Sequence, residues 1–171
     1  MPVALITLRV SVDPKIYRDI EISGDASLYK LAEVINTVFG FDFDHAFGFY
    51  DNLKNTHKSK IVYELFADMG EPSVNGAKSV KKSKVSHAFD TDGKAFAFLF
   101  DYGDEWLFQV KRTGSREQAA AKSFWKLTKS VGEAPEQYPE PEDDGDDRPF
   151  NEKYEMIKVG DLTVAKRREK K

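Results

Sequence analysis

The segment 95–111 constrains the fold more than any other part of this sequence. Its aromatic residues occupy every second position on both sides of Gly103. A turn centred there sets three pairs opposite one another: Phe100 with Trp106, Phe98 with Phe108, and Phe96 with Val110. Cross-strand aromatic pairs stabilise a sheet by about 0.2–1 kcal/mol each. The segment therefore predicts an antiparallel hairpin with one buried, aromatic face.

Other periodic segments predict the rest of a sheet and one long helix. Alternation favours strands over 3–10, 17–22 and 124–129, and a closing strand or hairpin over 154–164 with its turn at Gly160-Asp161. Helical spacing from Leu28 to Phe39 predicts a helix that Ser27 caps and Gly40 ends. Weaker patterns suggest short helices over 63–69 and 80–89, an extended segment over 39–50, and a polar loop or helical turn over 115–121. Together they predict an α+β fold, a mostly antiparallel sheet with two or three helices packed on one face.

The 171 residues fit a single domain. We expect this domain to span 1–165 and to include an irregular, acidic, proline-rich segment at 133–149, followed by a basic, frayed tail at 166–171. Cysteine is absent, which excludes disulfides and thiolate metal sites and suits a cytoplasmic location. No stretch approaches the roughly 20 apolar residues of a membrane span. The net charge of −3 disfavours nucleic acid as a partner without excluding it.

Catalytic motifs are missing from the sequence. It contains no Gly-x-Ser-x-Gly elbow and no glycine-rich phosphate loop, so we predict no catalytic residue and no cofactor. The three histidines, His45, His57 and His87, lack the spacing of a zinc helix, so we predict no metal site from them.

The tip of the predicted hairpin is the candidate site. Asp101 and Glu105 face each other across Gly103, with Asp104 beside them, and like charges opposite one another destabilise a hairpin. An Asx-type turn at Asp101 with solvated neighbours would relieve this, as would an arginine or lysine, or a divalent cation. We predict that Arg18 neutralises these acids, because its forked guanidinium suits carboxylates.

Three stretches of the sequence resemble a known family, the plasmid pRiA4b ORF-three-like family, whose members are also described as insertion-element passenger proteins of the TnpR type. These stretches are Asp13-Pro14-Lys15-Ile16-Tyr17-Arg18, the segment 39–49 with His45, and Phe100-Asp101-Tyr102-Gly103-Asp104-Glu105-Trp106. The resemblance covers roughly residues 3–145, and Pro139 to Gly145 is similar to a further family motif. It implies an α+β fold and an uncharacterised function.

The sequence departs from the family pattern at four positions. Tyr17 and Phe41 stand where the family has tryptophan, Phe47 replaces a second histidine, and Asp144 stands where cysteine is frequent. A His/Cys metal site taken from the family therefore fails here, and no recombinase signature is present.

These observations favour a non-catalytic binding or adaptor domain with a protein partner. Its candidate binding residues are Arg18, His45, Asp101, Asp104 and Glu105. The alternative is a small enzyme or a nucleic-acid accessory factor associated with mobile elements, with a cation or phosphate site at the same tip.

Overall fold

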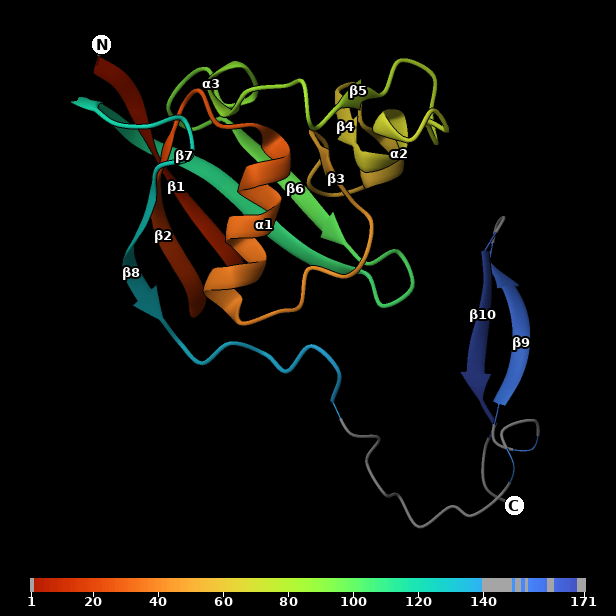
Figure 1. Ribbon diagram of the computed structural model, residues 1–171. Helices are drawn as coiled ribbons and strands as arrows, with labels where there is room; N and C mark the ends of the chain where they lie inside the picture. Colours follow the sequence, from red (N-terminus) through yellow and green to blue (C-terminus); the bar gives the residue numbers. More distant parts are fainter. Residues whose placement is uncertain (1, 140–148, 150–151, 153, 160–161, 169–171) are drawn as a thin grey trace. The chain divides into compact units, whose positions relative to one another are not determined.

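An eight-stranded sheet forms most of the first of two units into which the chain divides, Met1–Pro135 and Glu136–Lys171 (Figure 1). The computed structural model describes residues 2–139, 149, 152, 154–159 and 162–168. The sheet order is β5-β4-β3-β6-β7-β1-β2-β8, and only β4 and β5 pair in parallel. The strands are β1 (Pro2–Asp13), β2 (Ile16–Ser23), β3 (Phe47–Tyr50), β4 (Val62–Glu64), β5 (Lys78–Ser79), β6 (Ala95–Phe100), β7 (Trp106–Ala119) and β8 (Trp125–Val131).

The helices are few and mostly short. They are α1 (Leu28–Phe39), α2 (Leu65–Asp68), α3 (Val85–Ala88) and the 3₁₀ turn η1 (Thr56–Lys58). The α+β class is confirmed, but the predicted packing of all helices on one face is wrong. The α1 helix packs on one face of the sheet, which we call the inner face, whereas Phe66 of α2 contacts Tyr102, which packs with residues of the opposite face.

The second unit contains one antiparallel hairpin, β9 (Tyr154–Val159) with β10 (Leu162–Arg167). A closing strand or hairpin was predicted over 154–164, and the residues predicted for its turn, 160–161, lie outside the described residues. The β10 strand runs through Arg167, and the boundary of the predicted basic tail at 166–171 stays a prediction. Residues 140–148 of the acidic segment, with Asp144, and residues 169–171 of the tail also lie outside the described residues. That residues 1–165 form one domain stays a prediction.

The register predicted for the central hairpin is confirmed. Phe100 pairs with Trp106, Phe98 with Phe108, and Phe96 with Val110. The loop or helical turn predicted at 115–121 is wrong, because β7 continues to Ala119 as the partner of β1, past an irregularity beside Thr7. A polar segment without its own periodicity is held as a strand by a partner distant in the sequence.

Between α1 and the sheet lies the main core. The α1 helix begins at Ser27, whose Oγ accepts a hydrogen bond from the Lys30 N–H, and ends at Gly40, whose φ of 71° is left-handed. Its buried face meets the aromatic side chains of β3, β6 and β7. The fully buried phenylalanines in this core are Phe47, Phe49, Phe89, Phe96, Phe98 and Phe100.

Two weaker predictions are correct only in part. The helix predicted over 80–89 shrinks to α3, and only residues 47–50 of the extended segment 39–50 form a strand. Phe41 and Phe43 of that segment still pack into the core, whereas His45 is exposed.

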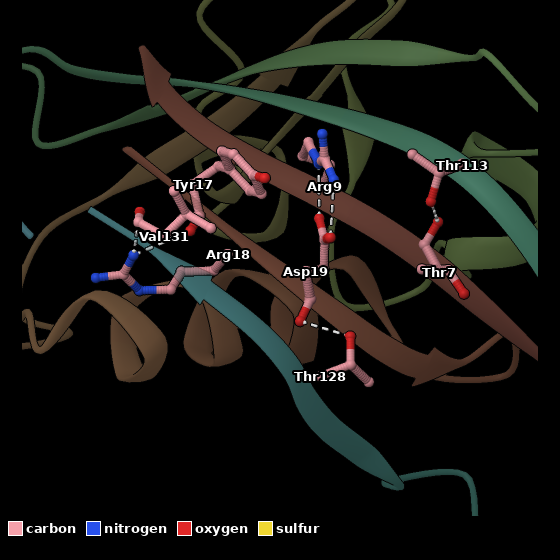
Figure 2. Close-up of polar contacts among 8 residues, drawn as sticks. All are labelled: Thr7, Arg9, Tyr17, Arg18, Asp19, Thr113, Thr128 and Val131. Atoms are coloured by element: carbon pink, nitrogen blue, oxygen red, sulfur yellow. Dashed lines mark hydrogen bonds and ion pairs between the residues drawn. The ribbon is translucent and has the colours of Figure 1, made fainter. Parts of the chain in front are cut away.

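Arg18 joins three parts of the fold. Its Nε donates to Val38 O at 3.2 Å in the last turn of α1, and its Nη1 donates to the carbonyls of Tyr17 (2.9 Å), Val131 (2.9 Å) and Gly132 (3.1 Å). Figure 2 shows its contact with Val131 of β8. The guanidinium also lies 4.9 Å from the centre of the Phe39 ring. Helix-terminal carbonyls favour a cation, so this buried arginine is stabilised without a carboxylate.

We expect Arg18→Met to lower the free energy of unfolding by about 2–4 kcal/mol, because it removes four charge-assisted hydrogen bonds from buried carbonyls. The matched control is Arg9→Met. Arg9 lies in β1 on the opposite face of the sheet from Arg18, and its partially exposed ion pair with Asp19 contributes about 1 kcal/mol or less. Urea unfolding measures both. Equal losses in the two variants would refute the role of Arg18.

Candidate functional site

Asp101 closes the tip of the β6–β7 hairpin. Its Oδ1 accepts hydrogen bonds from the N–H groups of Gly103 (3.0 Å) and Asp104 (3.2 Å), which form the Asx-type turn considered for this position. Its own N–H donates to Ala46 O at 2.9 Å, and its carbonyl accepts the Glu105 N–H at 2.6 Å. Asp101 is buried, with a left-handed φ of 64° that these four contacts hold in place.

His45 lies beside this turn. Its Nδ1 is 2.7 Å from Asp44 Oδ1 and 3.6 Å from Asp101 Oδ2, and its ring meets the Phe100 ring edge-on. The hydrogen bond to Asp44 is the main cause that raises the pKa of His45, and the charges of Asp101, Asp44 and Asp104 act in the same direction. Burial opposes them. The neighbouring carboxylates therefore favour the protonated form of the imidazole.

Asp104 and Glu105 are exposed at the tip. Glu105 has a left-handed φ of 55°, and its side chain forms no hydrogen bond or ion pair with any residue that the structure describes. The tip thus brings together four of the five predicted binding residues: His45, Asp101, Asp104 and Glu105.

The prediction that Arg18 neutralises this tip is wrong. All four of its hydrogen bonds go to main-chain carbonyls, and it forms no ion pair with Asp101, Asp104 or Glu105, all of which the structure describes. The end of α1 and the end of β8 supply the oxygen atoms that the guanidinium needs, so no carboxylate is required.

Within the described part of the chain, no group of three or more His, Cys, Asp or Glu side chains could hold a metal ion. His57 lies in η1 and His87 in α3, apart in sequence from His45. No helix among the described residues is long and apolar enough to cross a membrane.

A second charged cluster, on the outer face of β1 and β2, was not predicted as a site. Arg9 forms a bidentate ion pair with Asp19, at 2.8 and 3.0 Å, and its guanidinium carbon lies 4.0 Å from the centre of the Tyr17 ring (Figure 2). Alternation in the two strands already placed Arg9, Tyr17 and Asp19 on the face away from the core. The strand register, which sets them side by side, was the missing information.

Comparison with known proteins gives a family and a fold. A family described as plasmid pRiA4b ORF-3-like protein matches residues 3–167. No curated protein matches the chain. The solved structure of a protein of unknown function, MM3350 from Methanosarcina mazei Go1, is similar with a TM-score of 0.58 and 19% identity. The similarity covers 75% of this chain and 70% of that one, and it shows the fold alone.

The raised pKa of His45 predicts a pH dependence of stability. A group whose pKa is higher in the folded state stabilises the protein below its unfolded pKa of about 6.5, and this contribution is lost as the pH rises through the folded pKa. We therefore expect the melting temperature of the wild type, relative to His45→Gln, to be higher at pH 6 than at pH 8.5.

Thermal unfolding of both proteins across this range measures the difference. His57→Gln is the control, because η1 lies outside the tip, and it should keep the pH profile of the wild type. A constant difference between wild type and His45→Gln at all pH values would contradict the tip geometry.

Proposed function

The chain belongs to the plasmid pRiA4b ORF-3-like family, and we propose that it is a non-catalytic binding domain whose contact surface is the hairpin tip with His45, Asp101, Asp104 and Glu105. Arg18, which the sequence placed in this surface, is buried beneath α1 and is not part of it. A cytoplasmic location stays a prediction from the cysteine-free composition.

The backbone of Glu105 is the observation that carries this proposal. Among the described residues, Asp101 and Glu105 are the non-glycine residues with positive φ. For Asp101 the hydrogen bonds of its carboxylate explain the conformation. For Glu105 no side-chain contact explains it, since its exposed side chain forms no hydrogen bond or ion pair with any residue that the structure describes. Glycine or asparagine adopts this conformation at lower energy, by about 1 kcal/mol.

A strained backbone at an exposed, charged residue is typical of a surface selected for contact. The tip is also held rigidly, because Asp101 bonds the turn internally and ties it to Ala46. A rigid surface binds a partner at a smaller cost in conformational entropy. We infer that the Glu105 carboxylate binds a partner and does not stabilise the fold.

The charge of the tip supports a basic partner. Asp44, Asp101 and Asp104 act on the imidazole of His45, and Glu105 adds an exposed carboxylate to the same turn. Such a surface complements lysine and arginine side chains, and we propose a basic polypeptide segment as the partner. These carboxylates would repel a phosphate group at the tip. The charges therefore do not support the alternative function in which the tip is a phosphate site.

The stability of a single variant gives the first test of the proposal. Glu105→Asn should raise the free energy of unfolding by about 0.5–1 kcal/mol, because asparagine tolerates the left-handed backbone. Urea unfolding measures this gain. A loss of stability would show that Glu105 has a structural role, which contradicts the proposal.

Asp104→Asn/Glu105→Asn should weaken binding of a fluorescently labelled lysine-rich peptide at least about fivefold, measured by anisotropy at low and high salt. The matched control, Glu71→Gln/Glu133→Gln, removes the same charge from two exposed positions outside the tip and should bind as the wild type does. Equal weakening in both double variants would mean that net charge alone attracts the peptide.

A further inference from the structure

The outer face of β7, β1, β2 and β8 is a second surface of different charge. We call it the open face, because α1 packs on the inner face of the sheet and the long side chains of the outer face reach solvent. Register and contacts place these charged and aromatic residues on it: Arg9, Tyr17, Asp19, Glu21, Lys111, Arg116, Lys126 and Lys129.

Basic side chains dominate the open face. Its two carboxylates are already paired: Asp19 with Arg9, and Glu21 with Arg116 at 2.6 and 3.1 Å. Lys111 and Lys129 are exposed and form no ion pair with any residue that the structure describes. The face is therefore positive on a chain whose net charge is −3.

The basic groups lie in one row across the sheet. In the strand register Lys111 pairs with Arg9, Arg9 pairs with Asp19, and Asp19 pairs with Lys129. Four adjacent strands place the two ends of this row about 14 Å apart. Two ammonium groups that form no ion pair with any described residue thus flank an arginine whose own charge is balanced by Asp19.

Arg9 lies over the ring of Tyr17 in the middle of the open face, and Figure 2 shows the two side chains as neighbours. The bidentate pair with Asp19 fixes the plane of the guanidinium, and the Tyr17 ring supports it at 4.0 Å. The Lys129 ammonium lies 5.7 Å from the same ring. Guanidinium planes and tyrosine rings are the groups on which proteins stack unpaired bases.

We propose that the open face binds single-stranded nucleic acid. Lys111 and Lys129 contact the phosphates, and the stack of Arg9 and Tyr17 supports a base. A single strand fits better than a duplex, because its bases are free to stack and a flat sheet face does not enter a groove. An acidic peptide would use the two lysines but has no need of a guanidinium held over a tyrosine ring. This proposal is independent of the hairpin tip.

The test measures anisotropy of a fluorescein-labelled deoxythymidine oligomer with the full chain over a series of salt concentrations. Lys111→Gln/Lys129→Gln should weaken binding at least about fivefold and reduce the slope of log K against log salt by about 1.4, which is 0.7 for each phosphate contact. Lys58→Gln/Lys60→Gln is the matched control, because it removes the same charge from the exposed loop around η1. It should keep the affinity of the wild type.

Arg9→Lys separates stacking from charge, since lysine keeps the positive charge but has no planar guanidinium group. It should also weaken binding at least about fivefold. The proposal is overturned if the oligomer does not bind at low salt, if both lysine double variants lose affinity equally, or if Arg9→Lys binds as the wild type does. Equal affinity for a labelled polyglutamate peptide would likewise overturn it and indicate an acidic protein partner.

Discussion

A single long helix has to cover the inner face of an eight-stranded sheet, and this constraint shapes the rest of the structure. The 12 residues of α1 extend about 18 Å, whereas eight strands extend about 34 Å across their direction. Phenylalanine side chains fill the space that the helix leaves over β3, β6 and β7. Three further rings come from segments between the strands: Phe41 packs on Trp106 and Phe108, Phe43 on Tyr29 and Phe47, and Phe89 on Phe96. The high aromatic content of the chain, 13%, is thus a packing requirement.

Local patterns in the sequence were sufficient for the elements that local residues determine. The register of the β6–β7 hairpin follows from alternation around Gly103, and the ends of α1 follow from Ser27 and Gly40. The end of β7 could not be predicted in this way, because its last residues are strand only through pairing with β1. Pairing between distant segments also decides which side chains of the outer face become neighbours.

Arg18 shows why a site could not be assembled from charges alone. Alternation correctly placed it on the inner face with Ile20, but the expectation that an arginine seeks carboxylates was wrong. Helix α1 leaves carbonyls without partners in its last turn: Asn36 O receives the Phe41 N–H, and Val38 O receives Arg18. Gly132, whose carbonyl also accepts from Arg18, has to be glycine here, because a Cβ would lie 2.4 Å from Lys15 O. The partner of Arg18 is thus backbone geometry, which no pattern of charged residues reveals.

The hairpin tip is anchored to β3 and the residue before it at two points. The Asp101 N–H donates to Ala46 O, and the Tyr102 hydroxyl lies 2.8 Å from that of Tyr50. Burial raises the pKa of both tyrosines, so both remain neutral hydrogen-bonding groups. Gly48 makes room for this pair, since a Cβ there would lie 2.9 Å from Tyr102 Oη.

These anchors give the acidic tip a fixed place in the same unit as the basic open face. Exposed charges act over a Debye length of about 8–10 Å at physiological salt, so an incoming partner responds to the nearest surface and not to the sum of all charges. A net charge of −3 therefore says little about partners here, because it averages a negative tip with a positive sheet face. The strand register keeps these two charges on separate surfaces of the unit.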